Sequence, residues 1–245
     1  MACNRTEDDE QDAGHPERMA GNFYGRRKAK PLKPAQRDAM ARSFPALRLD
    51  ITAPCPDDLA ALFAPAARFD GYGLEIGFGG GEHLIHRAGL HGELGLLGCE
   101  PFVNGMAKAV RDIAAGGIGN IRLFGEDATL LLDWLPDRCL DRIDLYYPDP
   151  WPKKRHWKRR FVNAGNLARF HRVLKPGGEF RFACDIESYV NWTLRHVIAH
   201  GGFSWTAERA DDWRRPWPEW LSTRYEQKAV REGRAPAYFI FSRNP

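Results

Sequence analysis

The chain has 245 residues, of which 43% are hydrophobic and 28% are charged, and its formal net charge is +4. This composition supports one substantial α/β core and requires no second domain. No apolar run approaches the roughly 18 residues of a membrane-spanning helix, and no basic-then-apolar signal pattern opens the chain, so we expect no membrane partner. The five cysteines are scattered and lack metal-ligand spacing, which predicts a metal-free protein of the reducing cytoplasm.

The first fifty residues predict two segments of opposite charge. Residues 1–20 are acidic and polar, and we expect them to be disordered. Residues 21–50 form a basic N-terminal arm with this cluster of cations: Arg26, Arg27, Lys28, Lys30, Lys33 and Arg37. Such a segment suits a flexible arm that docks on phosphate, although a solvated linker explains it nearly as well.

The first strand-like run, residues 72–76, leads into a glycine-rich turn and a helix. Gly77, Gly79 and Gly81 are spaced as G-x-G-x-G, which lets a ligand lie against the backbone at a helix N-terminus. Glu75 lies inside the strand, where it would repel a dinucleotide pyrophosphate but attract the positive charges of S-adenosylmethionine. The pattern therefore favours S-adenosylmethionine. The alternative interpretation of Glu75 is a buried acid paired with an Arg or Lys.

Acids also follow the next two apolar runs. Residues 94–99 end at Glu100, which can accept both hydroxyls of a ribose. Residues 121–124 end shortly before Asp127, which could accept the exocyclic amine of adenine. Acids at successive strand ends predict an adenosine pocket, although Glu100 and Asp127 could instead cap helices.

The most informative segment follows a strand expected at residues 143–147. Asp149 lies between Pro148 and Pro150, which predicts a stiff turn that holds its carboxylate just past the strand end. Six basic residues follow: Lys153, Lys154, Arg155, Lys158, Arg159 and Arg160. A fixed carboxylate beside an aromatic ring and a cationic cluster suits a splayed nucleobase and its phosphates. A proline-rich loop before a solvated helix is the alternative.

The remaining pattern alternates between helix and strand. We expect a helix from about residue 157 to 173, with Arg155 and Arg159 on one outward face. Its sheet-facing positions would be Phe161, Gly165 and Ala168. The other expected elements are a helix at 103–114, a turn at 175–178, a strand at 179–184, a helix at 187–199 and a strand at 237–241. This order predicts a single doubly wound, mainly parallel sheet.

Three segments together resemble the bacterial tRNA (guanine-N7)-methyltransferases, which are Rossmann-like class I enzymes. They are residues 74–81, residues 148–160 and the segment Thr223-Arg224-Tyr225-Glu226. The likeness runs from about residue 21 to the C-terminus and gives a methyltransferase domain at residues 51–245. The glycine motif is shared by many class I methyltransferases, whereas the proline, tryptophan and basic motif is much more specific.

The resemblance implies methyl transfer from S-adenosylmethionine to guanine N7 in the tRNA variable loop. It implies that Glu75, Glu100, Asp127 and Asp149 line the cofactor pocket, with Asp149 also catalytic. It implies tRNA contacts by these residues: Lys153, Arg155, His156, Trp157, Lys158, Arg159, Arg160, Asp185, Thr223, Arg224, Tyr225 and Glu226. A methyltransferase acting on another RNA or on a small molecule, a nicotinamide dehydrogenase and a non-catalytic RNA-binding protein of the same fold remain as alternatives.

The expected chemistry depends on positioning, because guanine N7 has an in-plane lone pair and loses no proton on attack. Positive charge passes to the purine, so a carboxylate at its Watson–Crick edge gains attraction in the transition state. Asp149, Asp185 or Glu226 could supply that carboxylate, and Asp185 could instead cap the next helix. The sequence leaves the oligomeric state open, because four C-terminal tryptophans suit a core, an interface or a stacking surface: Trp205, Trp213, Trp217 and Trp220.

Overall fold

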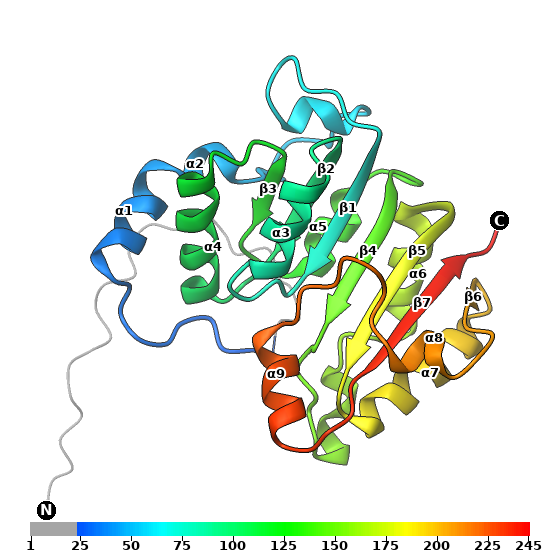
Figure 1. Ribbon diagram of the computed structural model, residues 1–245. Coiled ribbons are helices and arrows are strands. Elements are labelled where there is room, and N and C mark those ends of the chain that lie inside the picture. Colours follow the sequence, from blue (N-terminus) through cyan, green and yellow to red (C-terminus); the bar gives the residue numbers. More distant parts are fainter. Residues whose placement is uncertain (1–23) are drawn as a thin grey trace, which may run out of the picture.

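The computed structural model describes residues 24–245 (Figure 1). In this part of the chain a seven-stranded sheet has the order β3-β2-β1-β4-β5-β7-β6. The strands are β1 Gly71–Ile76, β2 Leu94–Cys99, β3 Ile121–Phe124, β4 Leu140–Tyr146, β5 Leu174–Cys184, β6 Phe203–Trp205 and β7 Ala237–Arg243. The first five strands of the chain, β1 to β5, pair in parallel, and β7 and β6 add antiparallel pairings at one edge. The doubly wound, mainly parallel sheet is confirmed.

Helices cover both faces of the sheet (Figure 1). The helices are α1 Pro34–Arg42, α2 Phe44–Leu47, α3 Glu82–Leu90, α4 Val103–Gly116, α5 Ala128–Trp134, α6 Ala164–Val173, α7 Glu187–His200, α8 Asp211–Arg214 and α9 Arg224–Arg231, with 3-10 segments at η1 Leu59–Leu62 and η2 Lys154–Arg159. One core joins the sheet to α5, α6 and α7, and a second joins it to α1, α3 and α4. Leu96 and Leu97 are neighbours in β2, yet each is fully buried in a different core. A central parallel strand is therefore apolar on both faces, which makes it a continuous hydrophobic run.

The helix predicted from residue 157 to 173 is wrong in its first half. Lys154–Arg159 forms a 3-10 segment, and α6 begins at Ala164 after Asn163, whose side chain accepts a hydrogen bond from Asn166 N. The predicted inward face is also wrong, because Gly165 and Ala168 are exposed. The buried face consists of Asn166, Leu167, Phe170 and Val173. The predicted turn at 175–178 lies within the irregular first part of β5.

The N-terminal prediction is tested only from Tyr24 onward, so the acidic tail lies outside the described residues. In the second half of the predicted arm, α1 packs against α4 and buries Ala39. Arg48 then forms a parallel bridge to Leu123 in β3. These contacts fix residues 34–48 on the domain. The sequence analysis did not predict α1, α2 or β6.

All four C-terminal tryptophans make ring contacts. Trp213 stacks on Phe239 with ring centroids 6.2 Å apart. Trp217 and Trp220 pack against Tyr146 at 5.5 and 4.9 Å, and Trp205, although 42% exposed, has its ring centroid 5.5 Å from that of Phe239. Among residues 24–245, no helix combines the length and apolar character needed to cross a bilayer.

Candidate active site

An open cavity of about 860 Å³ lies at the carboxyl ends of the parallel strands. Open α/β sheets bind their ligands at this edge, and pockets for small ligands measure about 300–1,000 Å³. Four predicted acids line the cavity: Glu100, Asp127, Asp149 and Asp185. They follow β2, β3, β4 and β5 respectively, so the sheet brings together residues that are far apart in the sequence.

The glycine-rich turn after β1 forms the floor beside Glu100. Gly79 has a φ of 57°, in the left-handed region that favours glycine. Its N–H donates to Glu100 Oε2 at 2.7 Å. A Cβ on Gly105 of α4 would lie 2.4 Å from the Gly79 carbonyl oxygen, so glycine is also required on the facing helix. Gly77 and Gly79 line the cavity, whereas Gly81 lies behind it at the N-cap of α3.

Glu100 is fixed in place before any ligand binds. Its Oε1 accepts a hydrogen bond from Phe102 N at 2.8 Å, and only 8% of the residue is exposed. Burial raises the pKa of its carboxyl to about 7, against the effect of the two backbone donors. Asp127 caps α5 by accepting from Thr129 N at 2.9 Å while it lines the cavity. The capping interpretation therefore holds for Asp127.

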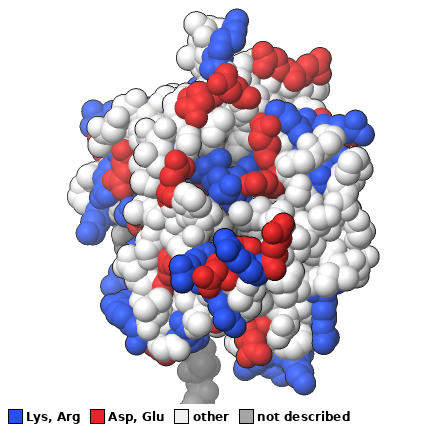
Figure 2. Space-filling model, turned by 45° about the vertical axis from the view of Figure 1, so that its right-hand side comes forward, with Lys and Arg blue, Asp and Glu red and all other residues white. Residues whose placement is uncertain are grey.

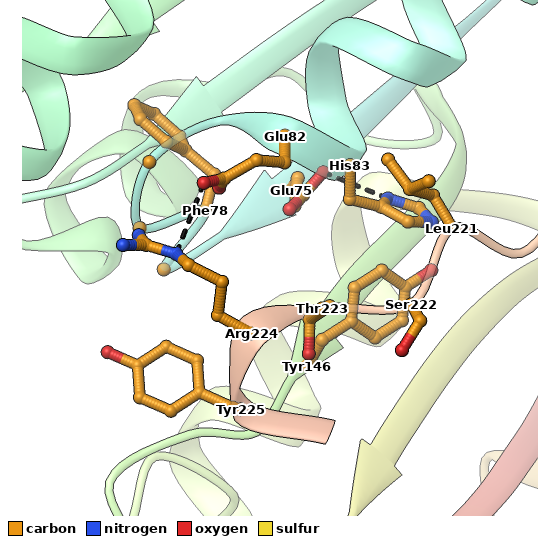
Figure 3. Close-up of a pocket in the computed structure, with 13 residues that line it drawn as sticks. Glu75, Phe78, Glu82, His83, Tyr146, Leu221, Ser222, Thr223, Arg224 and Tyr225 are labelled. Atoms are coloured by element: carbon orange, nitrogen blue, oxygen red, sulfur yellow. Dashed lines mark hydrogen bonds and ion pairs between the residues drawn. The ribbon is translucent and has the colours of Figure 1, made fainter. Parts of the chain in front are cut away.

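Glu75 lies beside the cavity, in a second, smaller pocket (Figure 3). It is buried in β1, and its Oε2 lies 3.3 Å from His83 Nδ1. The partner is thus a histidine of α3, where the alternative interpretation expected Arg or Lys. The His83 ring packs against Tyr146 and Trp220 with centroids at 4.7 and 5.1 Å.

Asp149 lies in a strained loop at the cavity mouth. The flanking residues Tyr147 and Trp151 have φ values of 48° and 44°, which are rare for large side chains. The Asp149 side chain is exposed to solvent in the cavity, but the surrounding protein partly desolvates it and raises its pKa. The predicted stiff turn is present, and two left-handed aromatic residues shape it together with the prolines.

Arg160 is placed differently from its prediction as an RNA contact. It is 1% exposed, and its guanidinium donates to Pro150 O at 3.0 Å, Ser188 O at 2.7 Å and Ser188 Oγ at 2.9 Å. It also lies over the Trp157 ring, 4.5 Å from the centroid. The side chain links the Asp149 loop to the start of α7, and these protein contacts occupy its guanidinium.

The rest of the basic segment lies at the surface. Lys153, Arg155 and Lys158 are exposed. Arg159 lies over the rings of Tyr24 and Trp151, at 5.3 and 5.0 Å from their centroids. Partial desolvation and neighbouring cations lower the pKa of His156. Figure 2, which brings the right-hand side of Figure 1 forward, shows acidic and basic side chains intermixed on that face.

The segment Thr223 to Glu226 forms the start of α9. Thr223 and Glu226 make a reciprocal capping box, and Glu226 also accepts from Trp220 Nε1 at 2.8 Å and from the Tyr238 hydroxyl. Glu226 is 7% exposed. Its carboxylate is engaged inside the protein by the Trp220 indole, the Tyr238 hydroxyl and the backbone N–H of Thr223. Arg224 pairs with Glu82 at 3.2 Å (Figure 3), and Tyr225 is exposed at the cavity.

Asp185 follows β5 and does not cap α7, because the N-cap is Ile186. Its Oδ2 accepts a hydrogen bond of 2.5 Å from Arg234 Nε. The sequence analysis missed Arg234 and Tyr24, which line the cavity together with Arg26. Arg26 belongs to the predicted basic arm, so that charge cluster was a signal for it, whereas no local motif marks Arg234. No cluster of potential metal ligands occurs within the described residues.

Comparisons with known proteins identify the class and then the family. Residues 72–238 match the family model described as "Putative methyltransferase". This match and the parallel sheet define a methyltransferase of the Rossmann-like class. A tRNA (guanine-N(7)-)-methyltransferase of Agrobacterium fabrum is 58% identical over 221 residues, which cover 90% of this chain and 94% of the relative. The protein of the same name from Brucella melitensis is 54% identical over 232 residues, 95% and 99% of the two chains. The chain belongs to the tRNA (guanine-N(7)-)-methyltransferase family, as the sequence motifs predicted.

A solved structure supports the fold assignment independently. The 16S rRNA methyltransferase KamB superposes with a TM-score of 0.53, covering 73% of this chain and 90% of that one. The two sequences are only 15% identical. At that identity the similarity establishes the fold and gives no information on the substrate.

Proposed function

We propose that this protein transfers a methyl group from S-adenosylmethionine to N7 of a guanine in the variable loop of tRNA. One observation carries the proposal beyond family membership. Four acids from four strand ends converge in one cavity, whose lining also includes Lys158 and Arg159. Carboxylates suit a positively charged cofactor and the donor edge of guanine, and cations suit the RNA backbone. The proposed location is the cytoplasm.

The cofactor pocket is assigned to the β1–β3 side of the cavity. S-adenosylmethionine supplies an electrophilic methyl group on a sulfonium when it is bound. Glu100 is fixed by two backbone donors, and an ionised carboxylate keeps further lone pairs for the ribose hydroxyls. Asp127 keeps one oxygen for the adenine amine while the other caps α5. Glu75 adds negative charge behind the glycine turn, so the residues present fit the cofactor.

The base site is assigned to the β4–β5 side. Guanine N7 needs no general base, so Asp149 and Asp185 act by orientation and charge. As positive charge develops on the purine, ionised carboxylates near its Watson–Crick edge stabilise it more strongly than in the ground state. We assign catalysis to Asp149 and reading of the guanine edge to Asp185. Glu226 already accepts hydrogen bonds from Trp220 and Tyr238, which supports excluding it from the proposed base site.

The RNA backbone is assigned to the exposed cations around the Asp149 loop. Lys153, Arg155 and Lys158 are free to meet phosphates without disturbing the core. Arg159 extends this surface toward Tyr24 through its contacts with two aromatic rings. Phosphate contacts give affinity without sequence information. Selection of the guanine therefore falls to the cavity.

Nucleoside mass spectrometry tests the proposal directly. Unmodified tRNA transcript is incubated with the protein and S-adenosylmethionine labelled in its methyl group, then digested to nucleosides. We expect labelled 7-methylguanosine with the wild type and with Asp57→Ala, a control at an exposed acid outside the cavity. We expect none with Asp149→Ala. Label in another nucleoside, or in none, would reject the proposed reaction.

A further inference from the structure

Helix α9 forms one wall of the cavity and is anchored at both ends. At the N-terminal end of the helix, Arg224 pairs with Glu82 of α3 at 3.2 Å (Figure 3). After its last turn, Arg234 pairs with Asp185 at 2.5 Å. Between these ends, Glu226 is held by the capping box and Ala229 is fully buried. These contacts hold the helix in place at both ends.

The backbone of Arg234 is held in place, whereas its side chain has an alternative partner to Asp185. Its N–H donates to Ala229 O at 2.9 Å, and the preceding Gly233 has a φ of 73°, as in a helix C-terminal turn. The guanidinium has a second acceptor, because Nη1 also pairs with Glu232. The Arg234 side chain is 36% exposed, whereas that of Asp185 is 10% exposed. If Arg234 leaves Asp185, it keeps Glu232 and water, but Asp185 then needs a new donor.

The guanidinium of Arg234 has the chemistry of the base that the cavity is proposed to hold. In guanine, N1–H and the exocyclic amine are bonded to the same carbon, C2. This edge of the base therefore has the arrangement of a guanidine group. Both groups offer adjacent N–H donors to a carboxylate. Adenine presents an acceptor at N1, which would face the Asp185 oxygens unfavourably. Arg234 thus gives Asp185 one N–H donor of the kind that guanine would supply, from Nε to Oδ2 at 2.5 Å, while its Nη1 donates to Glu232.

We propose that Arg234 is a stand-in for the guanine edge, which occupies Asp185 in the RNA-free protein and is displaced by the target base. This inference rests on the proposed function, because it takes Asp185 as the guanine-reading group. Until RNA binds, Arg234 compensates the charge of the largely buried Asp185 side chain in a cavity that Asp149 and Glu100 also line. It also competes with the base, so the measured affinity for the target nucleotide is lower than the cavity alone would give.

The competition is measured by removing Arg234 and isolating the contribution of the base. Two tRNA transcripts are compared, one with guanine at the target position and one with an abasic nucleotide there. The ratio of their dissociation constants is the base contribution, and phosphate contacts cancel from it. With Arg234→Met we expect this ratio to rise by about 1.5- to 5-fold, the equilibrium factor for breaking a partly exposed ion pair. The control Arg231→Met removes an exposed cation of α9 that does not line the cavity, and the ratio should stay unchanged.

Two further variants separate competition from a structural role. In an Asp185→Asn background, Arg234→Met should no longer change the ratio, since the carboxylate for which the two groups compete is gone. Glu232→Gln leaves the Arg234–Asp185 pair intact but removes the negative charge of the alternative acceptor, so the ratio should fall. Thermal unfolding confirms that each variant is folded.

A lower ratio in Arg234→Met would mean that Arg234 positions Asp185 for the base, and it would overturn the stand-in. An unchanged ratio would overturn it as well. Both results are distinct from failure of the proposed function, because wild-type protein that forms no 7-methylguanosine would remove the guanine subsite altogether.

Discussion

Replacing Arg160 by alanine should lower the stability of the protein, because this side chain holds the Asp149 loop in place. We expect this effect to exceed any direct effect on RNA binding. The residue is 1% exposed and donates three hydrogen bonds, to Pro150 O, Ser188 O and Ser188 Oγ. Its guanidinium also contacts the Trp157 and Tyr189 rings, with centroids at 4.5 and 4.8 Å. Alanine leaves two carbonyl acceptors without this donor and opens a cavity between aromatic rings. We expect a loss of about 3–5 kcal/mol in the free energy of unfolding.

Urea denaturation followed by tryptophan fluorescence measures this loss as a lower midpoint with an unchanged m-value. Lys158→Ala is the matched control, since Lys158 is an exposed cation of the same segment, and its effect on stability should stay within about 0.5 kcal/mol. The reasoning fails if Arg160→Ala unfolds at the wild-type urea concentration while its tRNA affinity becomes less sensitive to salt. That combination would place Arg160 on phosphates.

Three other predictions concern the cavity and its rim. Asp149→Ala should abolish 7-methylguanosine formation yet keep tRNA affinity within about twofold, because the grip on RNA is mainly phosphate charge; a filter-binding assay beside the mass spectrometry checks both. Burial raises the pKa of Glu100 to about 7, so below that pH ribose binding must first release a proton. Calorimetric affinity for S-adenosylmethionine should therefore weaken as pH falls through 7 and level off above it, and Glu100→Gln should remove that dependence. Arg155→Ala with Lys158→Ala should flatten the plot of log affinity against log salt by about 0.7–0.9 per lost contact, and an unaltered slope would place the phosphates elsewhere.

The sheet could be predicted because each central strand carries its own signal. Residues 94–99 were expected as a strand and match β2. Leu96 and Leu97 face opposite cores there, so the run has no polar interruption. Edge strand β6 has three residues, two of them exposed, and it pairs only with β7. Its existence depends on a partner more than thirty positions away, which a local pattern does not contain.

The basic segment shows why charge spacing is a weak guide to helix phase. Arg155 and Arg159 lie four residues apart, which suits one helix face, but the intervening residues form a 3-10 segment. The better signal was Asn163, since asparagine is a preferred N-cap and its side chain does cap α6. Burial of Arg160 depends on Ser188, which is 28 positions away. No window on the sequence would have separated Arg160 from its exposed neighbours.

The segment Thr223 to Glu226 also contains a local signal for the start of a helix. A threonine followed three positions later by glutamate is the capping-box pattern, and the structure shows both of its hydrogen bonds. The family resemblance implied tRNA contacts for the same four residues. Thr223 and the two exposed residues after it, Arg224 and Tyr225, all line the smaller pocket, and Tyr225 also lines the larger cavity.

The division of the cavity into two sides explains why four acids can serve one reaction. The proposed methyl transfer moves one positive charge from the cofactor side to the base side, and both sides are lined by carboxylates. In the proposed arrangement, Glu100 and Asp127 attract the charge before transfer, whereas Asp149 and Asp185 attract it as it reaches the purine. Only the second pair can favour the transition state over the bound reactants. Loss of Glu100 should therefore act mainly on cofactor affinity, and loss of Asp149 on turnover.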